Sequence, residues 1–424
     1  MKDYEQFEPQ LIKSAKGAYL ELQNGRQIID AISSWWCKSW GHQHPELKKA
    51  LLEQLDRYEH VIGANTCQAP SALLAAKLAT LCSPLNHVSY ASDGSCAIEI
   101  ALKMSVHAQQ ILGKTSRRHF MALNNGYHGE TCLALSVSDL GLYRQPYESL
   151  LTPVTFLHQL PYVNNTQDPL WHDCSDYWPA IEAQLTPHAD TLSALILEPI
   201  LQGAGGMKIY SADFLRRIRK WTAAQGIHLI ADEIMTGLGR TGMPLACHHA
   251  AVTADIICLG KNLTGGMLPL SAVVCSNDIY ELFYDDYEKG NNFLHSHTYT
   301  GHALACQVAL ASLTLLQDDS MQRKIKTNSE LMANLMKELA EQCSFITNVR
   351  HLGMMAAADL VAPEGNVSGR HGYRVFQEAI KLGAWLRPLG NTLYWLPPFI
   401  CDTVTLKDLQ SITLKALNKL YAVD

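Results

Sequence analysis

The fold of this 424-residue chain is decided by the stretch IHLIADEIMTGLGRTG at residues 227–242 and by DIICLGKNLTGG at residues 255–266. Each stretch begins with a short apolar run that has the length and composition of a buried strand. The first run ends at Asp232, and the second leads into Lys261 about 30 residues later, which is the length of one βαβ unit. Because ligands bind beyond the carboxyl ends of strands in an open α/β sheet, we expect the carboxylate and the amine to face one ligand.

The surroundings of Lys261 indicate its chemistry. A glycine precedes it and Thr-Gly-Gly follows at residues 264–266, so the backbone can approach a ligand closely. A desolvated lysine amine forms Schiff bases with aldehydes, and a carboxylate such as Asp232 keeps a pyridine nitrogen protonated. With Ile234 packing on one face of the ring, these residues predict pyridoxal 5'-phosphate (PLP) as cofactor. The alternative is a solvated loop lysine, which is the usual interpretation of an isolated lysine.

The rest of the chain predicts two domains. Strands alternate with helices across residues 85–275, which indicates a mostly parallel sheet covered on both faces. Residues 140–190 are polar and predict loops with one weak helix. Beyond about residue 320, three helices mixed with strand-like runs predict a smaller α+β domain. Residues 18–32 alternate around an Asn-Gly pair and predict a β-hairpin that joins this domain. The other strands predicted for the large sheet are 87–91, 119–123, 192–197 and 269–275.

Composition and charge exclude several classes of protein. Hydrophobic residues make up 47% of the chain and charged residues 17%, as in soluble globular enzymes. A net charge of −6 provides no basic surface for nucleic acid. The first ten residues lack the apolar core of a signal peptide, and no run approaches a membrane span. We therefore expect a cytoplasmic protein that binds neither nucleic acid nor membrane.

Cysteines and histidines give no sign of a metal site. The twelve cysteines include no CxxC pair, and with no export signal they are expected to be reduced and mostly buried. His295, His297 and His302 suit turn and helix-start positions. We therefore expect no bound metal.

Two further motifs fit a PLP site. Gly94 and Ser95 lie between a predicted strand and a long helix, where free backbone N–H groups and the helix dipole bind phosphate. The alternative there is a simple helix N-cap. Tyr127 lies in the turn Asn-Gly-Tyr-His-Gly after another predicted strand, where an aromatic ring can stack on a planar cofactor.

The pattern Asp-Glu-Ile-x-Thr-Gly-x-Gly-Arg from Asp232 to Arg240, with a lysine at this spacing, resembles the class III pyridoxal-phosphate aminotransferases. The resemblance extends from about residue 18 to the end of the chain. It implies the α/β architecture of fold type I PLP-dependent transferases. In this architecture residues 45–305 form the large PLP-binding domain, and residues 1–44 and 306–424 together form the small domain.

Other motifs resemble one branch of this family, which aminates 8-amino-7-oxononanoate in biotin synthesis. They are Ser33-Ser34-Trp35-Trp36, residues 125–129, Glu198-Pro199 with the Gly-rich residues 202–207, Trp385-Leu386-Arg387-Pro388 and residues 394–398. The resemblance implies S-adenosylmethionine as amino donor and a homodimer. It also implies two half-reactions in which Lys261 moves the proton.

The resemblance also implies a role for each site residue. Trp35 and Trp36 line the aliphatic chain of the keto acid, with Tyr127 at its border, and Arg387 pairs with its carboxylate. Without the resemblance, core packing and a surface salt bridge are the simpler interpretations of these tryptophans and this arginine. Arg240 lies near the substrate entrance. The residues implied to bind the cofactor are Gly94, Ser95, Tyr127, Glu198, Asp232, Ile234, Lys261 and, from the second subunit, Thr298.

Several alternatives fit part of the same pattern. The sequence His295-Ser296-His297-Thr298 and the acid Glu130 depart from the relatives near the donor pocket, so lysine is an alternative donor. Another class III transaminase, acting on ornithine or ω-amino acids, would not need the tryptophan pair. A PLP-dependent mutase or racemase would need no external amino acceptor, and a non-catalytic α/β binding protein would need no Schiff base at Lys261.

Overall fold

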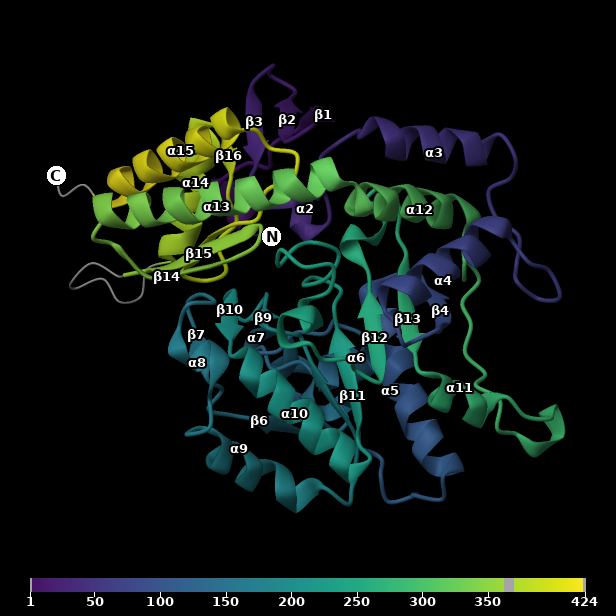
Figure 1. Cartoon of the computed structure of the whole chain (residues 1–424). Helices are drawn as coiled ribbons and strands as arrows, with labels where there is room; N and C mark the ends of the chain where they lie inside the picture. Colours follow the sequence, from purple (N-terminus) through teal and green to yellow (C-terminus); the bar gives the residue numbers. More distant parts are fainter. Residues whose placement is uncertain (1, 362–369, 422–424) are drawn as a thin grey trace. The chain divides into compact units, whose positions relative to one another are not determined.

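The computed structural model describes residues 2–361 and 370–421 (Figure 1). The chain forms two compact units. The large unit contains residues 49–314, and the small unit contains residues 1–48 and 315–424.

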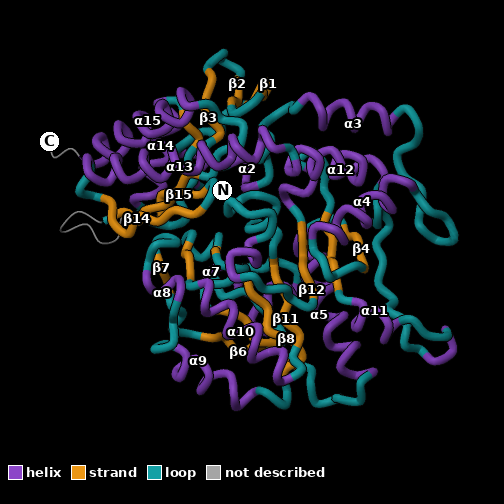
Figure 2. The backbone as a smooth tube through the Cα atoms, viewed as in Figure 1, coloured by secondary structure: helices purple, strands orange, loops and turns teal. Residues whose placement is uncertain are grey.

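A seven-stranded sheet forms the centre of the large unit, and its strands are drawn in orange in Figure 2. Its strands are parallel except for β13, which is antiparallel to both of its neighbours. The predicted mostly parallel sheet is therefore confirmed. In spatial order the strands are β4 (His87–Ala91), β13 (Ser271–Cys275), β12 (Ile256–Leu259), β11 (His228–Asp232), β8 (Leu192–Leu197), β5 (His119–Leu123) and β6 (Val154–Leu157).

Both faces of this sheet are covered. All six residues of β8 are buried, and successive side chains of a strand point to opposite faces. On one face, helix α5 packs Ile98 and Leu102 against Ile196, Ile230 and Ile256 of the strands. The helices from residue 45 to residue 317 are α3 (Pro45–Leu55), α4 (Ala69–Leu81), α5 (Gly94–Ile111), α6 (Cys132–Ser136), α7 (Gly141–Arg144), α8 (Pro169–His172), α9 (Trp178–Leu185), α10 (Ala212–Gln225), α11 (Asn277–Phe283) and α12 (Ala303–Gln317).

The ends of α10 illustrate how local sequence sets an element. The hydroxyl of Ser211 accepts the backbone N–H groups of Asp213 and Phe214, which caps the start of the helix. Gly226 ends the helix in the left-handed conformation, with φ 63°. Both ends of α10 are therefore set by residues of its own sequence.

The prediction of loops for residues 140–190 was partly wrong. This region contributes the edge strand β6, helices α8 and α9, and one strand of a small sheet. These elements are short and polar segments separate them, so the region as a whole shows no long apolar periodicity. The small sheet has the order β7 (Tyr162–Val163), β10 (Lys208–Tyr210) and β9 (Leu201–Gln202).

The small unit is built from both ends of the chain. The predicted hairpin is confirmed as β2 and β3, which flank Gly25 with φ 83°, and β3 pairs in parallel with β16. One sheet has the order β1 (Ile12–Lys16), β2 (Tyr19–Leu22), β3 (Gln27–Asp30) and β16 (Ala384–Trp385). The other has the order β14 (Ile346–Leu352), β15 (Met355–Leu360) and β17 (Thr392–Trp395). The helices of this unit are α1 (Asp3–Gln6), α2 (Ser33–Trp36), α13 (Asp319–Gln342), α14 (His371–Leu382) and α15 (Thr403–Tyr421).

Candidate active site

The carboxyl ends of the parallel strands gather most of the predicted site residues of the large unit at one edge of the sheet. Asp232 ends β11, Glu198 follows β8, and Lys261 lies two residues beyond the end of β12. Gly94 begins α5 shortly after β4, and Tyr127 lies in the loop after β5. This edge is where open α/β sheets bind their ligands.

Asp232 is buried and held in one orientation. Its Oδ2 lies 2.7 Å from Nδ1 of His128, and the two side chains are 5% and 0% exposed. Its Oδ1 accepts the N–H of Ile234 at 3.1 Å. Because Nδ1 faces a carboxylate, this nitrogen carries the imidazole proton, and the buried Nε2 has no hydrogen-bond partner among the described residues. Sequence reasoning gave His128 no role, since its partner lies 104 residues away.

Ile234 lies against Gly94 and against Gly260, the residue before Lys261. A Cβ added to Gly94 would lie 3.1 Å from Cδ1 of Ile234, and one added to Gly260 would lie 3.2 Å from its Cγ2. The side chain of Ile234 therefore fills the space between the start of α5 and the residue that precedes Lys261.

Lys261 has an unusual backbone conformation. It begins a short 3-10 helix, Lys261–Thr264, directly after Gly260. Its φ is 42°, in the left-handed region that residues other than glycine rarely adopt. Such strain often accompanies functional residues, because the surrounding structure must hold it.

The start of α5 is close to the loop that carries Tyr127. Asp93 caps the helix by accepting the N–H of Cys96 at 3.0 Å, so a side chain does act as N-cap. The hydroxyl of Ser95 accepts the N–H of Glu130 at 3.3 Å. A Cβ on Gly129, whose φ is 126°, would lie 2.2 Å from this hydroxyl, so only glycine fits there. The helix N-terminus retains the geometry that favours a bound anion.

Glu198 holds the loop of Tyr127 through the backbone. Its two carboxylate oxygens accept the N–H of Tyr127 at 3.0 Å and the N–H of Gly203 at 2.9 Å. Complete burial raises the pKa of Glu198 to about 7, and the negative charge of Asp232 acts in the same direction. The hydroxyl of Tyr127 donates to Glu130 at 3.0 Å, and burial together with this bond raises the pKa of Tyr127. The phenol is therefore neutral at physiological pH.

Arg240 and Thr298 differ in exposure. Arg240 follows β11 and is fully buried, whereas the side chain of Thr298 is exposed and its backbone carbonyl accepts a hydrogen bond from His60. Nearby, Nε2 of His295 lies 2.9 Å from Nε2 of His297. Within residues 2–361 and 370–421, no group of three or more His, Cys, Asp or Glu side chains is arranged to hold a metal ion.

In the small unit, the two predicted tryptophans have different environments. Trp36 is 3% exposed and its indole N–H donates to the hydroxyl of Tyr394 at 3.0 Å. Trp35 is 44% exposed, its ring is stacked on Trp36 at 6.1 Å, and the guanidinium of Arg387 lies 4.4 Å from its centroid. The structure thus brings Trp35, Trp36 and Arg387 together, with Tyr394 as a partner to which sequence reasoning gave no role.

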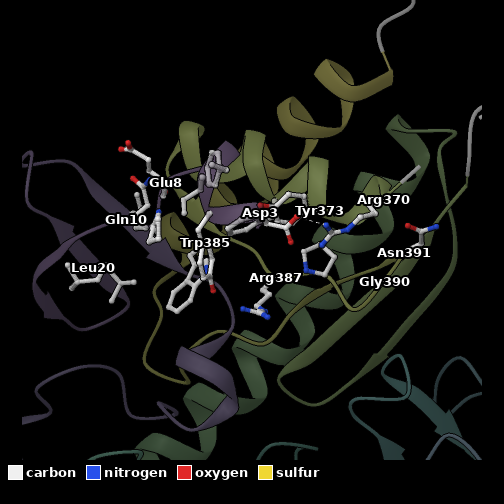
Figure 3. A pocket seen from close by; sticks show the side chains of 18 residues that line it. Asp3, Glu8, Gln10, Leu20, Arg370, Tyr373, Trp385, Arg387, Gly390 and Asn391 are labelled. Atoms are coloured by element: carbon white, nitrogen blue, oxygen red, sulfur yellow. Dashed lines mark hydrogen bonds and ion pairs between the residues drawn. The ribbon is translucent and has the colours of Figure 1, made fainter. Parts of the chain in front are cut away.

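Arg387 also lines a pocket of about 730 Å³, which lies within the small unit (Figure 3). Figure 3 shows Arg387 apart from the ion pair that Arg370 forms with Asp3 at 2.8 Å. No carboxylate pairs with Arg387 in the described part of the chain. The volume of this pocket is in the range of small-molecule binding sites. The aromatic residues that line the pocket are Tyr4, Phe7, Tyr373, Phe376 and Trp385.

The residues of the large unit fit PLP. The N-terminus of α5 suits its phosphate, the buried Asp232 suits its pyridine nitrogen, and Lys261 supplies the amine for its aldehyde. A search of the described helices finds none that is both long and apolar enough to span a membrane.

The sequence pattern that defines the family "Aminotransferase class-III" matches residues 2–417. The adenosylmethionine-8-amino-7-oxononanoate aminotransferase of Helicobacter pylori is 38% identical over 425 residues, which cover 99% of this chain and 94% of the relative. Its name gives the reaction of that protein.

Solved structures resemble the chain over nearly its full length. The structure of adenosylmethionine-8-amino-7-oxononanoate aminotransferase from Methanocaldococcus jannaschii has a TM-score of 0.89 and 29% identity, covering 99% of this chain and 95% of that chain. An amine transaminase from an uncultivated Pseudomonas species, solved in its PLP-bound form, has a TM-score of 0.88 and 29% identity, with 99% and 96% covered. Since both the family pattern and the bacterial relative extend over almost every residue, this chain belongs to the class III aminotransferases.

Proposed function

We propose that the protein transfers an amino group from S-adenosylmethionine to 8-amino-7-oxononanoate, giving 7,8-diaminononanoate for biotin synthesis. The names of the similar proteins from H. pylori and M. jannaschii support this substrate. The observation that carries the proposal is the environment of Arg387, whose guanidinium stacks on Trp35 beside a pocket with aromatic walls. A cation without a carboxylate partner in the described part of the chain, at a pocket with aromatic and polar walls, suits a ligand with an aliphatic chain and a terminal carboxylate.

PLP is the cofactor in this proposal. When bound, it supplies an electron sink for the substrate carbon and carries the amino group between the two substrates. Gly94 and Ser95, at the N-terminus of α5, would bind its phosphate, and Ile234 and Tyr127 would pack on its ring. Asp232 holds a proton on the pyridine nitrogen.

The protein's own groups move the protons. Nζ of Lys261 would take the proton from the α-carbon of the amino donor as general base and would deliver it, as general acid, to the cofactor carbon that carries the amino group. His128 keeps the carboxylate of Asp232 in one orientation, through the 2.7 Å contact between Nδ1 and Oδ2. Glu198 acts through the backbone of Tyr127 and fixes the loop that carries the aromatic ring.

The keto acid is bound by the small unit. The Arg387 guanidinium pairs with its carboxylate, and Trp35 and Trp36 line its aliphatic chain. The proposal also includes a cytoplasmic homodimer in which Thr298 contacts the cofactor of the second subunit and Arg240 lies near the substrate entrance.

The test separates the two half-reactions. S-adenosylmethionine, lysine or ornithine is added separately to the purified PLP-loaded protein while the visible absorption of the bound pyridoxal form is followed. We expect S-adenosylmethionine to convert it to the pyridoxamine form and 8-amino-7-oxononanoate to reverse the change. Conversion by lysine alone would change the donor in the proposal. No reversal by 8-amino-7-oxononanoate would reject the proposed substrate.

A further inference from the structure

The backbone that carries the tryptophan pair is a left-handed turn. Ser33, Ser34, Trp35 and Trp36 have φ values of 51°, 45°, 73° and 72°, and none of them is glycine. A single residue other than glycine in this region is already uncommon. Four in succession persist only where surrounding contacts hold them, and such strain tends to occur at binding sites.

Asp30, the last residue of β3, provides the contacts that hold this turn. Its side chain is completely buried, and its Oδ1 accepts the backbone N–H of Ser34 at 2.9 Å. Its Oδ2 accepts the hydroxyl of Ser34 at 2.7 Å and lies 2.8 Å from Nε2 of His42. The carboxylate therefore binds both the backbone and the side chain of Ser34, and His42 fixes the carboxylate itself.

A second contact fixes the other side of the turn. The hydroxyl of Ser33 donates to the backbone carbonyl of Leu396 at 2.7 Å, just after β17. Trp36 is anchored by the hydroxyl of Tyr394, which belongs to the same strand. The turn is thus held at three of its four residues, Ser33, Ser34 and Trp36.

The turn determines where the ring of Trp35 lies. Trp35 is the one tryptophan of the pair that remains accessible, and the guanidinium of Arg387 lies over its ring. With an ordinary right-handed backbone at residues 33–36, the side chain of Trp35 would leave the turn in another direction. The hydrogen bonds between Asp30 and Ser34 hold the turn, and the position of the Trp35 ring against Arg387 therefore depends on them.

We infer that Asp30 is a positioning residue: through Ser34 it holds the left-handed turn that places Trp35 against Arg387, and so sets the affinity for the keto acid. The effect on affinity rests on the proposed function, whereas the effect on the ring of Trp35 does not. Serine at position 34, where glycine would be unstrained, serves this role because its hydroxyl gives Asp30 a second hydrogen bond to the turn.

The test uses Ser34→Ala, which removes the hydroxyl, and Ser34→Gly, which also frees the backbone. The matched control is Gln43→Gly, because Gln43 has φ 52° and an exposed side chain but makes none of the contacts described for Asp30. The proteins are labelled with 5-fluorotryptophan, and the ¹⁹F NMR signal of Trp35 is assigned by its loss in Trp35→Phe. The KM for 8-amino-7-oxononanoate, kcat and the thermal unfolding temperature are measured on the same holoenzymes.

We expect Ser34→Gly to shift and narrow the Trp35 signal and to raise KM about tenfold, the scale of one lost hydrogen bond to a charged group, with kcat changed less than about threefold. Its unfolding temperature should stay close to the wild-type value, because relief of strain offsets the lost bond. Ser34→Ala loses the same bond and keeps a Cβ at φ 45°, so it should change the signal and KM in the same direction and at least as much, and Gln43→Gly should change neither.

Two results would overturn the inference. One is a wild-type Trp35 signal in Ser34→Gly, and the other is a KM that changes equally in Ser34→Gly and Gln43→Gly. If the wild-type enzyme does not accept 8-amino-7-oxononanoate, the proposed substrate fails, and the ¹⁹F signal of Trp35 alone decides whether Asp30 and Ser34 hold the turn.

Discussion

Replacing His128 with alanine tests how the carboxylate beneath the proposed cofactor is held. The change removes the 2.7 Å contact to Oδ2 of Asp232, and the N–H of Ile234 remains as a partner of the other oxygen. A hydrogen bond to a charged group contributes about 1.5–3 kcal/mol. If His128→Ala loses this free energy in the transition state because Asp232 is no longer oriented, its kcat/KM falls by about 10- to 150-fold relative to the wild-type enzyme.

The informative control is His128→Asn, because the amide of asparagine can place an N–H near the position of Nδ1. We expect His128→Asn to recover most of the kcat/KM that His128→Ala loses, and PLP affinity, measured by fluorescence titration of the apoenzyme, to follow the same order. Unfolding temperatures of the two variants separate this effect from cavity formation. Equal kcat/KM for the alanine and asparagine variants would refute an orienting role of His128.

Two further predictions follow from charges in the two units. Arg387→Met should raise the KM for 8-amino-7-oxononanoate by about 10- to 100-fold, the value of a charged hydrogen-bonded pair, and an unchanged KM in steady-state assays would contradict the carboxylate contact. Burial raises the pKa of Glu198 from 4.5 to about 7, so the folded chain retains a proton that the unfolded chain releases between these pH values. The free energy of unfolding should therefore decrease by at most about 3 kcal/mol as the pH rises from 4.5 to 7. Urea unfolding at pH 5 and pH 7 measures this decrease, and Glu198→Gln should lack it. An equal change in the free energy of unfolding for the wild-type and Glu198→Gln proteins would exclude the raised pKa.

Most of the large sheet could be predicted from the sequence because its inner strands are buried on both faces. Strands at 87–91, 119–123 and 192–197 have the predicted bounds, since a polar residue follows each of them directly. Strand β6 was missed. It has four residues, lies at the edge of the sheet and follows a polar segment, so its sequence carries little signal.

Within the site, residues with distinctive local sequence were found and those defined by distant contacts were not. Asp232 stands out because it ends an apolar strand, and Lys261 stands out because it follows the next apolar strand after a single glycine. The partnership of His128 with Asp232 exists only in the folded chain, because it joins residues from the ends of two different strands. The left-handed turn at residues 33–36 could not be predicted either, because it contains no glycine or asparagine, the residues that usually adopt this conformation.

The most direct test of the proposed reaction follows the nitrogen atom itself. The holoenzyme is incubated with S-adenosylmethionine that carries ¹⁵N in its amino group and with 8-amino-7-oxononanoate, and the product is examined by mass spectrometry. We predict 7,8-diaminononanoate containing one ¹⁵N from the wild-type enzyme and none from Lys261→Ala. Absence of labelled diamine from the wild-type enzyme, under conditions in which S-adenosylmethionine is consumed, would contradict the proposed transamination.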